Sequence, residues 1–183
     1  YGICGVTMQL INPITHERMT IEHHAADDRA ESRVRFTLPA HQAGPPPHYH
    51  DRFDETFHVL EGELEISVGD AAPRRLLAGD HVTVPARTVH AFRNASAAPV
   101  TFRTEISGGR GFERFIRGWY GVAIDGRSGK QGAPRGLLDM VVLIDEGDVN
   151  VPGVPLFLQR GLRRALRWIA RLTGVEARLA RWW

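Results

Sequence analysis

The sequence is poor in cysteine: Cys4 is the only one in 183 residues, so no disulfide can form within the chain. It also lacks any run of the roughly 18 apolar residues that a membrane-spanning helix requires. The opening segment, YGICGVTMQL, has no basic stretch followed by a long apolar run, as a secretory signal would have. These absences argue against a disulfide-stapled, membrane-spanning or secreted protein, and we expect a cytoplasmic location.

Neither sign of charge is in large excess over most of the chain. The formal net charge is only +2, and the positive excess lies near the end. Residues 156–183 hold seven arginines and one acidic residue, whereas residues 1–155 hold 16 basic and 20 acidic side chains. The pI near 9.1 therefore describes the C-terminal segment and gives no general argument for a nucleic-acid partner. The sequence also shows no internal repeat and no helix-turn-helix pattern.

The sequence does have the apolar content of one domain with a sizeable core, at 43% of its residues. Alternation of apolar and polar residues predicts a series of short strands. Turn residues separate them about every 8–12 positions, which favours an antiparallel sandwich or barrel. The predicted strands cover residues 33–38, 53–59, 64–68, 81–84, 90–92 and 99–105.

Beyond Gly108 and Gly109 the apolar residues take up helical spacing. The predicted helices cover residues 112–123, 137–144 and 158–172, and Gly/Pro-rich loops are predicted at 126–134 and 147–155. The chain is therefore divided into an N-terminal extension with a first strand (1–29), a barrel (30–107) and a helical C-terminal extension (108–183).

The last predicted helix is strongly amphipathic and basic. Its apolar stripe consists of Leu158, Leu162, Leu166, Ile169 and Leu172, and arginines fill the rest. We expect the stripe to pack on the barrel or on a second subunit, with the arginines solvated or paired to acidic residues of the barrel. A membrane surface is a less favoured partner. Nucleic acid is less favoured still, because no aromatic residues interleave the arginines. The expected assembly is a homodimer.

Two segments carry the residues with the most distinctive chemistry, GPPPHYHDRFDETFHVLEG at 44–62 and GDHVTVPARTVHAFRN at 79–94. His48 and His50 are two apart, so an extended strand puts both side chains on one face. Glu55 lies on an otherwise apolar strand face, where an unpaired carboxylate would be very costly. Imidazole nitrogen and carboxylate oxygen are ligands that first-row divalent metals accept. With His90 from a separate strand, this set would leave an octahedral ion with two open positions.

These segments resemble the two sequence motifs of the cupins. The first motif is matched by His48, His50, Glu55 and Gly62, and the second by Gly79, Pro85, His90 and Asn94. One position departs: Arg87 stands where the second motif has Gly, which usually serves a backbone with positive φ. The resemblance implies a mainly-β fold, a double-stranded β-helix or jelly-roll cupin barrel, with C-terminal α-helices after it. It also implies a divalent transition metal (Fe, Mn, Ni, Cu or Zn) held by His48, His50, Glu55 and His90.

Cupins include dioxygenases, isomerases, decarboxylases and proteins without catalysis, so the fold alone does not choose a function. The residues predicted to line a substrate pocket are Phe57, Val59, Phe92, Phe102 and Arg87. The four apolar ones suit a small apolar or aromatic molecule. Arg87 either holds an anionic group at the pocket mouth or is a solvent-exposed turn residue.

Two readings of the site follow. His58 and Tyr49 lie on strand faces opposite the ligands, so no general base can be assigned beside the metal. This favours a metal-dependent enzyme of the oxygenase type, in which the metal does the chemistry, over an isomerase. The alternative is a non-catalytic cupin that binds a small molecule and uses the metal as a structural or ligand-holding element.

Overall fold

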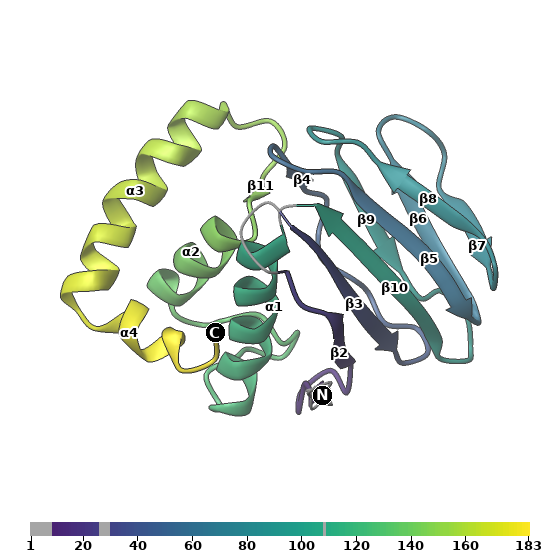
Figure 1. Cartoon of the computed structure of the whole chain (residues 1–183), viewed down its shortest axis with the longest axis horizontal. Helices are drawn as coiled ribbons and strands as arrows, with labels where there is room; N and C mark the ends of the chain where they lie inside the picture. Colours follow the sequence, from purple (N-terminus) through teal and green to yellow (C-terminus); the bar gives the residue numbers. More distant parts are fainter. Residues whose placement is uncertain (1–8, 26–29, 108) are drawn as a thin grey trace, which may run out of the picture.

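The computed structural model describes residues 9–25, 30–107 and 109–183, and it consists of a strand-rich part with a helical part beside it (Figure 1). The strands are β1 (Gln9–Ile11), β2 (Arg18–His23), β3 (Glu31–Leu38), β4 (Tyr49–His50), β5 (Glu55–Glu61), β6 (Glu63–Val68), β7 (Arg74–Leu77), β8 (His81–Val84), β9 (His90–Arg93), β10 (Val100–Ser107) and β11 (Val149–Asn150). The helices are α1 (Gly109–Ile124), α2 (Leu137–Glu146), α3 (Leu156–Leu172) and α4 (Val175–Ala180).

The strands form a large sheet in the order β1-β2-β3-β10-β5-β8 and a small sheet in the order β7-β6-β9. All the pairings among the described strands are antiparallel. Inward-facing residues of both sheets meet in one core, because alternate positions of each strand point to the same side. This core contains Leu38, Phe57, Val59, Leu64, Ile66, Leu76, Val84, Val100 and Phe102. The predicted mainly-β jelly roll with a helical extension is confirmed.

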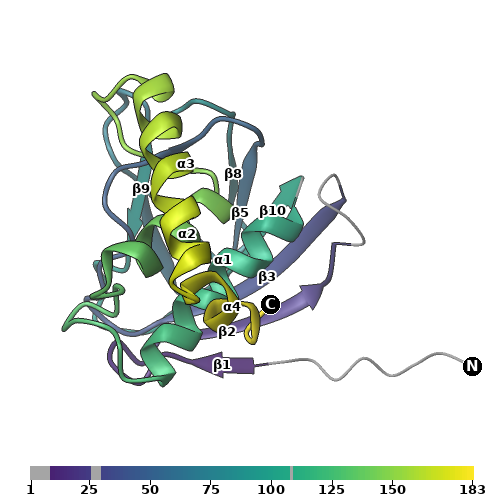
Figure 2. The same cartoon turned by 90° about the vertical axis from the view of Figure 1, so that its left-hand side faces the viewer.

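The helical part is joined to the large sheet by a second apolar cluster. Met19 and Ile21 of β2 and Ile106 of β10 pack there against Phe112 and Ile116 of α1. Figure 2, turned by 90°, shows α3 in front of α1 and α2, so α3 is the outer helix of this layer. None of the helices within the described residues is long and apolar enough to cross a membrane. The boundary predicted between residues 29 and 30 stays a prediction, although β1 and β2 hydrogen-bond into the same sheet as the barrel strands.

The predicted helices are confirmed. The patterns did not predict α4, β7 and β11, and the described part of residues 1–29 holds two strands, β1 and β2, where one was predicted. The segment 147–155 was predicted to be a loop, but it contains β11, in which Val149 pairs with His50 and Asn150 with Tyr49. A two-residue strand has no periodicity of its own, and its partner lies about a hundred positions earlier. Only the folded chain can reveal this pairing.

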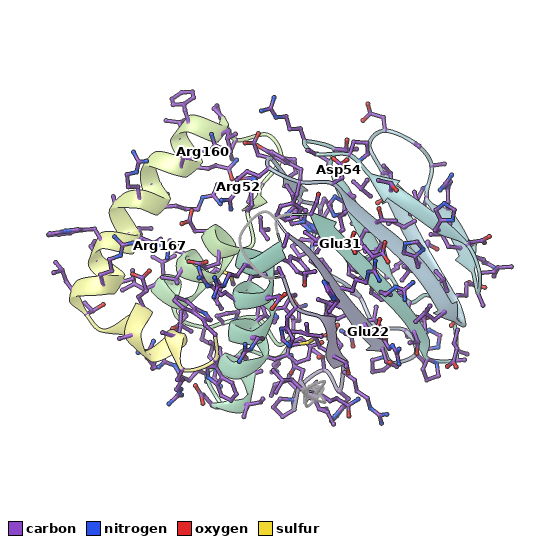
Figure 3. All side chains as sticks on the ribbon, in the orientation of Figure 1. Glu22, Glu31, Arg52, Asp54, Arg160 and Arg167 are labelled. Atoms are coloured by element: carbon purple, nitrogen blue, oxygen red, sulfur yellow. The ribbon has the colours of Figure 1, made fainter. Side chains whose placement is uncertain are left out.

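The structure decides against one of the two surfaces predicted for the apolar stripe of α3. Its apolar stripe does not pack on the barrel: Leu162 is 62% exposed and Leu172 is 67% exposed, whereas Arg163 is only 5% exposed. The arginines instead face the molecule, with Arg160 and Arg167 reaching inward from α3 (Figure 3). Acidic partners on the barrel and α2 explain this, because ion pairs and hydrogen bonds hold that face inward. Packing of the stripe on a second subunit, and the less favoured membrane surface, stay predictions.

Candidate metal centre

The folded chain brings the four predicted ligands together from three strands and one loop end. His48 precedes β4, His50 ends β4, Glu55 begins β5 and His90 begins β9. A β-bridge joins His48 to His90, with backbone N–H···O hydrogen bonds of 3.1 and 2.8 Å in the two directions. One ligand atom of each residue lies within 4.8 Å of the other three, and all four side chains are buried. This cluster could hold one metal ion.

Each histidine ring of the cluster is oriented by a backbone carbonyl. The Nδ1 atom of His48 donates to the oxygen of Pro46 at 2.9 Å, and that of His90 donates to Thr88 at 3.1 Å. The Nδ1 atom of His50 donates to the oxygen of Gly147 at 3.0 Å. A carbonyl oxygen can only accept, so the proton sits on Nδ1 and the Nε2 atoms face the cluster. Metal-binding histidines are commonly held in this way.

The Nε2 atom of His50 is the best test of whether a metal fits. It is fully buried and has no hydrogen-bond partner within the described residues. It lies 3.3 Å from Oε2 of Glu55, but the two are not aligned for a hydrogen bond. Buried polar atoms without partners are rare and costly, so such an atom needs an explanation. A metal ion at the centre of the cluster supplies one, and the donor set of nitrogen and oxygen suits a divalent transition metal.

Electrostatics put the cluster close to the protonation state that metal binding needs. Burial alone would raise the pKa of Glu55, but the imidazoles of His50 and His90 hold that pKa well below its usual range. Burial lowers the pKa of His48 to about 3, helped by the charges of His90 and His50, so this ring is neutral at pH 7. Burial also opposes the charge on His90, yet the hydrogen bond and charge of Glu55 outweigh it and raise the pKa of His90. A metal would replace the proton that His90 shares with Glu55 at 3.0 Å.

The helical extension supplies part of this site, which the sequence did not predict. The backbone oxygens of Gly147 and Asp148 lie 3.0 and 3.3 Å from Nδ1 of His50. The Asp148 carboxylate also accepts hydrogen bonds from the backbone N–H groups of Asp51 and Arg52, at 2.7 and 2.8 Å. Asp148 has a φ of 49°, as a residue in a tight turn does. The Gly-Asp pair after α2 indicated a turn, but nothing local indicated its contact with His50.

The residues predicted to line a pocket are placed mainly in the barrel core. Phe57, Val59 and Phe102 are 0%, 2% and 1% exposed, and Phe92 packs against them half-buried. The ring of Phe57 lies 6.1 Å from that of His90, so an aromatic layer adjoins the ligand cluster. Their contact with a substrate stays a prediction.

Arg87, the fifth predicted lining residue, keeps the turn geometry of the second motif. Its φ is +68°, the conformation that Gly usually serves. Its backbone N–H donates to the oxygen of His50 at 2.6 Å, so the turn supports a ligand strand. Its exposed side chain is paired with Asp51 at 2.8 Å. The substitution of Gly by Arg therefore leaves the local backbone intact, and any contact with an anionic substrate stays a prediction.

The other predicted positions fall outside the cluster, as expected. Nε2 of His58 lies 3.2 Å from a carboxylate oxygen of Glu105, and its ring stacks on that of His81. Arg103, which shares a strand face with Glu105, lies 3.4 Å from it. Tyr49 pairs with Asn150 in the small β4–β11 ladder.

A cleft of about 510 Å³ lies between α3 and the body of the molecule. It is lined by seven arginines and three acidic residues, together with Gly111 and Phe53. The ring of Phe53 also stacks on His50, with centroids 4.5 Å apart. Phe53 therefore lines the arginine-lined cleft and also contacts the ligand cluster.

Comparison with known proteins gives one family. The model of the cupin domain matches residues 34–106, a span that includes all four residues of the cluster. A relative from Penicillium expansum named "Probable oxidoreductase patJ" is 30% identical over 173 residues, which cover 87% of this chain and 52% of the relative. The protein of the same name from Aspergillus clavatus is 29% identical, with coverages of 87% and 53%. The chain thus spans about half the length of the curated relatives it matches.

Two solved structures are also similar. An RmlC-like cupin from Shewanella frigidimarina has a TM-score of 0.49 and 19% identity, over 60% of this chain and 91% of that one. KdgF from Halomonas sp. has a TM-score of 0.47 and 20% identity, over 58% of this chain and 92% of that one.

Proposed function

Because the chain belongs to the cupin superfamily, we propose that it is a metal-dependent oxidoreductase of the oxygenase type. Its substrate is a small, partly apolar or aromatic organic molecule. The observation that carries the proposal is the buried convergence of His48, His50, Glu55 and His90. The names of the two fungal relatives, both "Probable oxidoreductase", support the reaction class.

The chain contributes ligands, orientation and exclusion of water. Three imidazoles and one ionised carboxylate would hold the ion, and the carbonyls of Pro46, Thr88 and Gly147 fix the orientation of the three rings. A bound divalent ion with open positions supplies Lewis acidity and, when it is redox-active, one-electron chemistry. Phe53 and Phe57 border the cluster and keep its surroundings apolar.

The content of the cluster favours an oxygenase over an isomerase. Among the described residues, the group of ligand-type side chains holds only these three histidines and one glutamate. An isomerase that abstracts a proton needs a positioned general base besides the ligands. An oxygenase relies mainly on the metal, so this composition is sufficient for it.

A second candidate is a non-catalytic cupin that binds a small molecule. The burial of the cluster favours it, because His90 is 1% exposed and His48, the most exposed of the four, is only 7% exposed. The neighbouring aromatic rings pack on one another, with Phe57 and Phe92 centroids 5.3 Å apart. In this case the metal stabilises the folded state without turnover.

Metal content and oxygen consumption separate these proposals. We would load the full chain with Fe(II), Mn(II), Ni(II), Cu(II) or Zn(II) and measure bound metal by plasma mass spectrometry. Wild type would be compared with a His50→Ala/His90→Ala double variant and with His58→Ala as a matched control, since His58 lies outside the cluster. We expect near-stoichiometric metal in wild type and His58→Ala, and its loss in the double variant.

Oxygen uptake with a panel of phenolic and keto-acid substrates then tests turnover. Uptake that depends on a redox-active metal supports the oxygenase. Stoichiometric metal with thermal stabilisation but no turnover on any substrate supports the binding protein. Failure of every metal to bind the wild-type chain would refute both.

A further inference from the structure

The apolar face of α3 departs from ordinary surface chemistry, because large apolar side chains lie exposed along it. Six large side chains on this one helix are 40–72% exposed. They are Phe157, Leu158, Leu162, Trp168, Ile169 and Leu172. Val151 and Val154, just before the helix, are also exposed and extend the apolar surface. Contiguous exposed apolar surface of this kind usually marks an interaction site.

Helix α3 cannot rotate about its axis to bury this apolar face against its own chain. Its opposite face is fastened by Arg163, which is 5% exposed and hydrogen-bonds Asn150 and the oxygen of Val149. Arg160 pairs with Asp51 at 2.5 Å, and Arg167 with Asp145 at 2.6 Å. Rotation of α3 would break these contacts and bury charge. The apolar face is therefore held outward.

Small residues in the middle of this face indicate close approach by another element. Gly161 and Ala165 lie one helical turn apart, between the large side chains. A Cβ atom added at Gly161 would meet nothing within 4 Å, so nothing in the described chain requires Gly there. Glycine inside a helix is destabilising, and its use is to let another backbone or side chain come near. A shallow apolar groove lies over this point, lined by Gly161, Arg164, Ala165, Trp168 and Ile169.

The large and small side chains of this face are complementary to those of a second copy of α3 that runs antiparallel to it. Leu158 and Leu172 lie seven residues to either side of Ala165, and Gly161 and Trp168 lie four and three residues from it. A two-fold axis near Ala165 therefore sets the large Trp168 opposite a partner's Gly161. Two-fold interfaces are self-complementary in this sense. We propose that a second copy of this chain covers the α3 apolar face as an antiparallel helix pair, with Trp168 seated in the groove at Gly161.

The charges favour this partner over an acidic membrane surface. The arginines that would attract anionic lipid are mostly paired within the chain: Arg160 with Asp51, Arg167 with Asp145, and Arg171 with Glu176. Only Arg164 on the rim of the face has no ion pair among residues 9–25, 30–107 and 109–183. Membrane-surface helices typically present many free basic side chains beside the apolar face.

The test measures association of the full chain by light scattering and sedimentation, for wild type and three variants. Gly161→Leu fills the groove without a clash in the single chain, and Leu is a better helix former than Gly. Leu162→Ser removes one apolar contact of the face. Leu77→Ser is the matched control, because Leu77 is a 55% exposed leucine on β7. We expect a wild-type dimer, an unchanged dimer for Leu77→Ser, and a dissociation constant at least about tenfold weaker for the two α3 variants.

Circular dichroism should show Gly161→Leu and Leu162→Ser folded like wild type, so that loss of association is not loss of fold. A wild-type chain that stays monomeric up to about 100 μM would overturn the proposal. So would a dimer that Gly161→Leu leaves unchanged. Binding of the monomer to vesicles containing phosphatidylserine, abolished by Leu162→Ser, would assign the face to a membrane instead.

Discussion

The barrel and helix α3 depart in opposite ways from the rule that apolar side chains lie inside and polar ones outside. In the barrel, His50, Glu55 and His90 point inward and are each 5% exposed or less. On α3, Leu162 and Trp168 point outward at 62% exposure each. Buried polar groups and large exposed apolar patches are the informative exceptions, because each is costly unless another component completes it. We therefore propose a cation as the component that completes the first region, and a second protein surface as the one that completes the other.

The largest expected effect comes from substituting one of two neighbouring arginines on α3 and not the other. Arg163 is buried and hydrogen-bonds the oxygens of Asn150 and Val149, whereas Arg164 is exposed. Arg163→Met leaves buried acceptors without partners, so we expect a loss of about 3 kcal/mol in the free energy of unfolding. Arg164→Met should change it by about 0.5 kcal/mol or less. Denaturant unfolding of both variants measures the difference.

Equal effects of these two substitutions would contradict the inward-facing arginine face. A larger loss from Arg164→Met would mean that α3 is rotated, with its apolar stripe packed on the molecule. The unfolding slope with denaturant should stay the same in both variants, because neither changes the surface exposed on unfolding.

A smaller effect, on metal affinity, should follow from removing a contact between the helical extension and the barrel. Asp148→Ala removes the acceptor for the N–H groups of Asp51 and Arg52, beside the carbonyl that holds His50. Loss of such outer support typically weakens metal affinity about 10–100-fold. We expect this weakening in a competition titration with a metal chelator. Asp70→Ala, at an exposed turn after β6, is the control and should bind metal like wild type.

The smallest effect concerns pH and the helical region alone. Burial would raise the pKa of Glu176, but hydrogen bonds from Arg167 and Arg171 outweigh it and lower that pKa. The stabilisation is therefore present above the ordinary Glu pKa of 4.5 and is lost as pH falls through the lowered folded value. Unfolding at pH 7 and pH 3.5 should show an acid loss smaller by roughly 0.5 kcal/mol in Glu176→Gln than in wild type. An identical acid loss in both proteins would argue against these ion pairs.

The ligand cluster could be predicted because its pattern is local and its surroundings constrain it. His48 and His50 share a strand face by spacing alone, and Glu55 on an apolar face needed a partner. His90 was tied to them by the resemblance to cupin motifs, and the observed His48–His90 bridge explains why that position is used. The sequence therefore supplied all four residues, although not what holds their rings.

The contacts of the extension could not be predicted, since they join residues far apart. The hydrogen bond between His50 and Gly147 spans 97 positions, and the β4–β11 pairing spans a similar distance. For α3, periodicity established two faces but not which one turns inward. That choice depends on where Asp51, Asp145 and Glu146 lie in the folded chain. Helical amphipathicity does not predict which face turns inward when charged partners in the folded chain hold the arginine face more strongly than apolar packing would hold the other.

The anchoring of His50 by the turn after α2 has a consequence for protein engineering. The family match ends at residue 106, which invites a cut there to obtain a minimal barrel for grafting or fusion. Such a fragment would leave the His50 ring without its orienting carbonyl and the Asp51 and Arg52 amides without their acceptor. The smallest transferable unit for this candidate metal centre therefore reaches at least to Asn150 of β11, well past the recognisable cupin motifs.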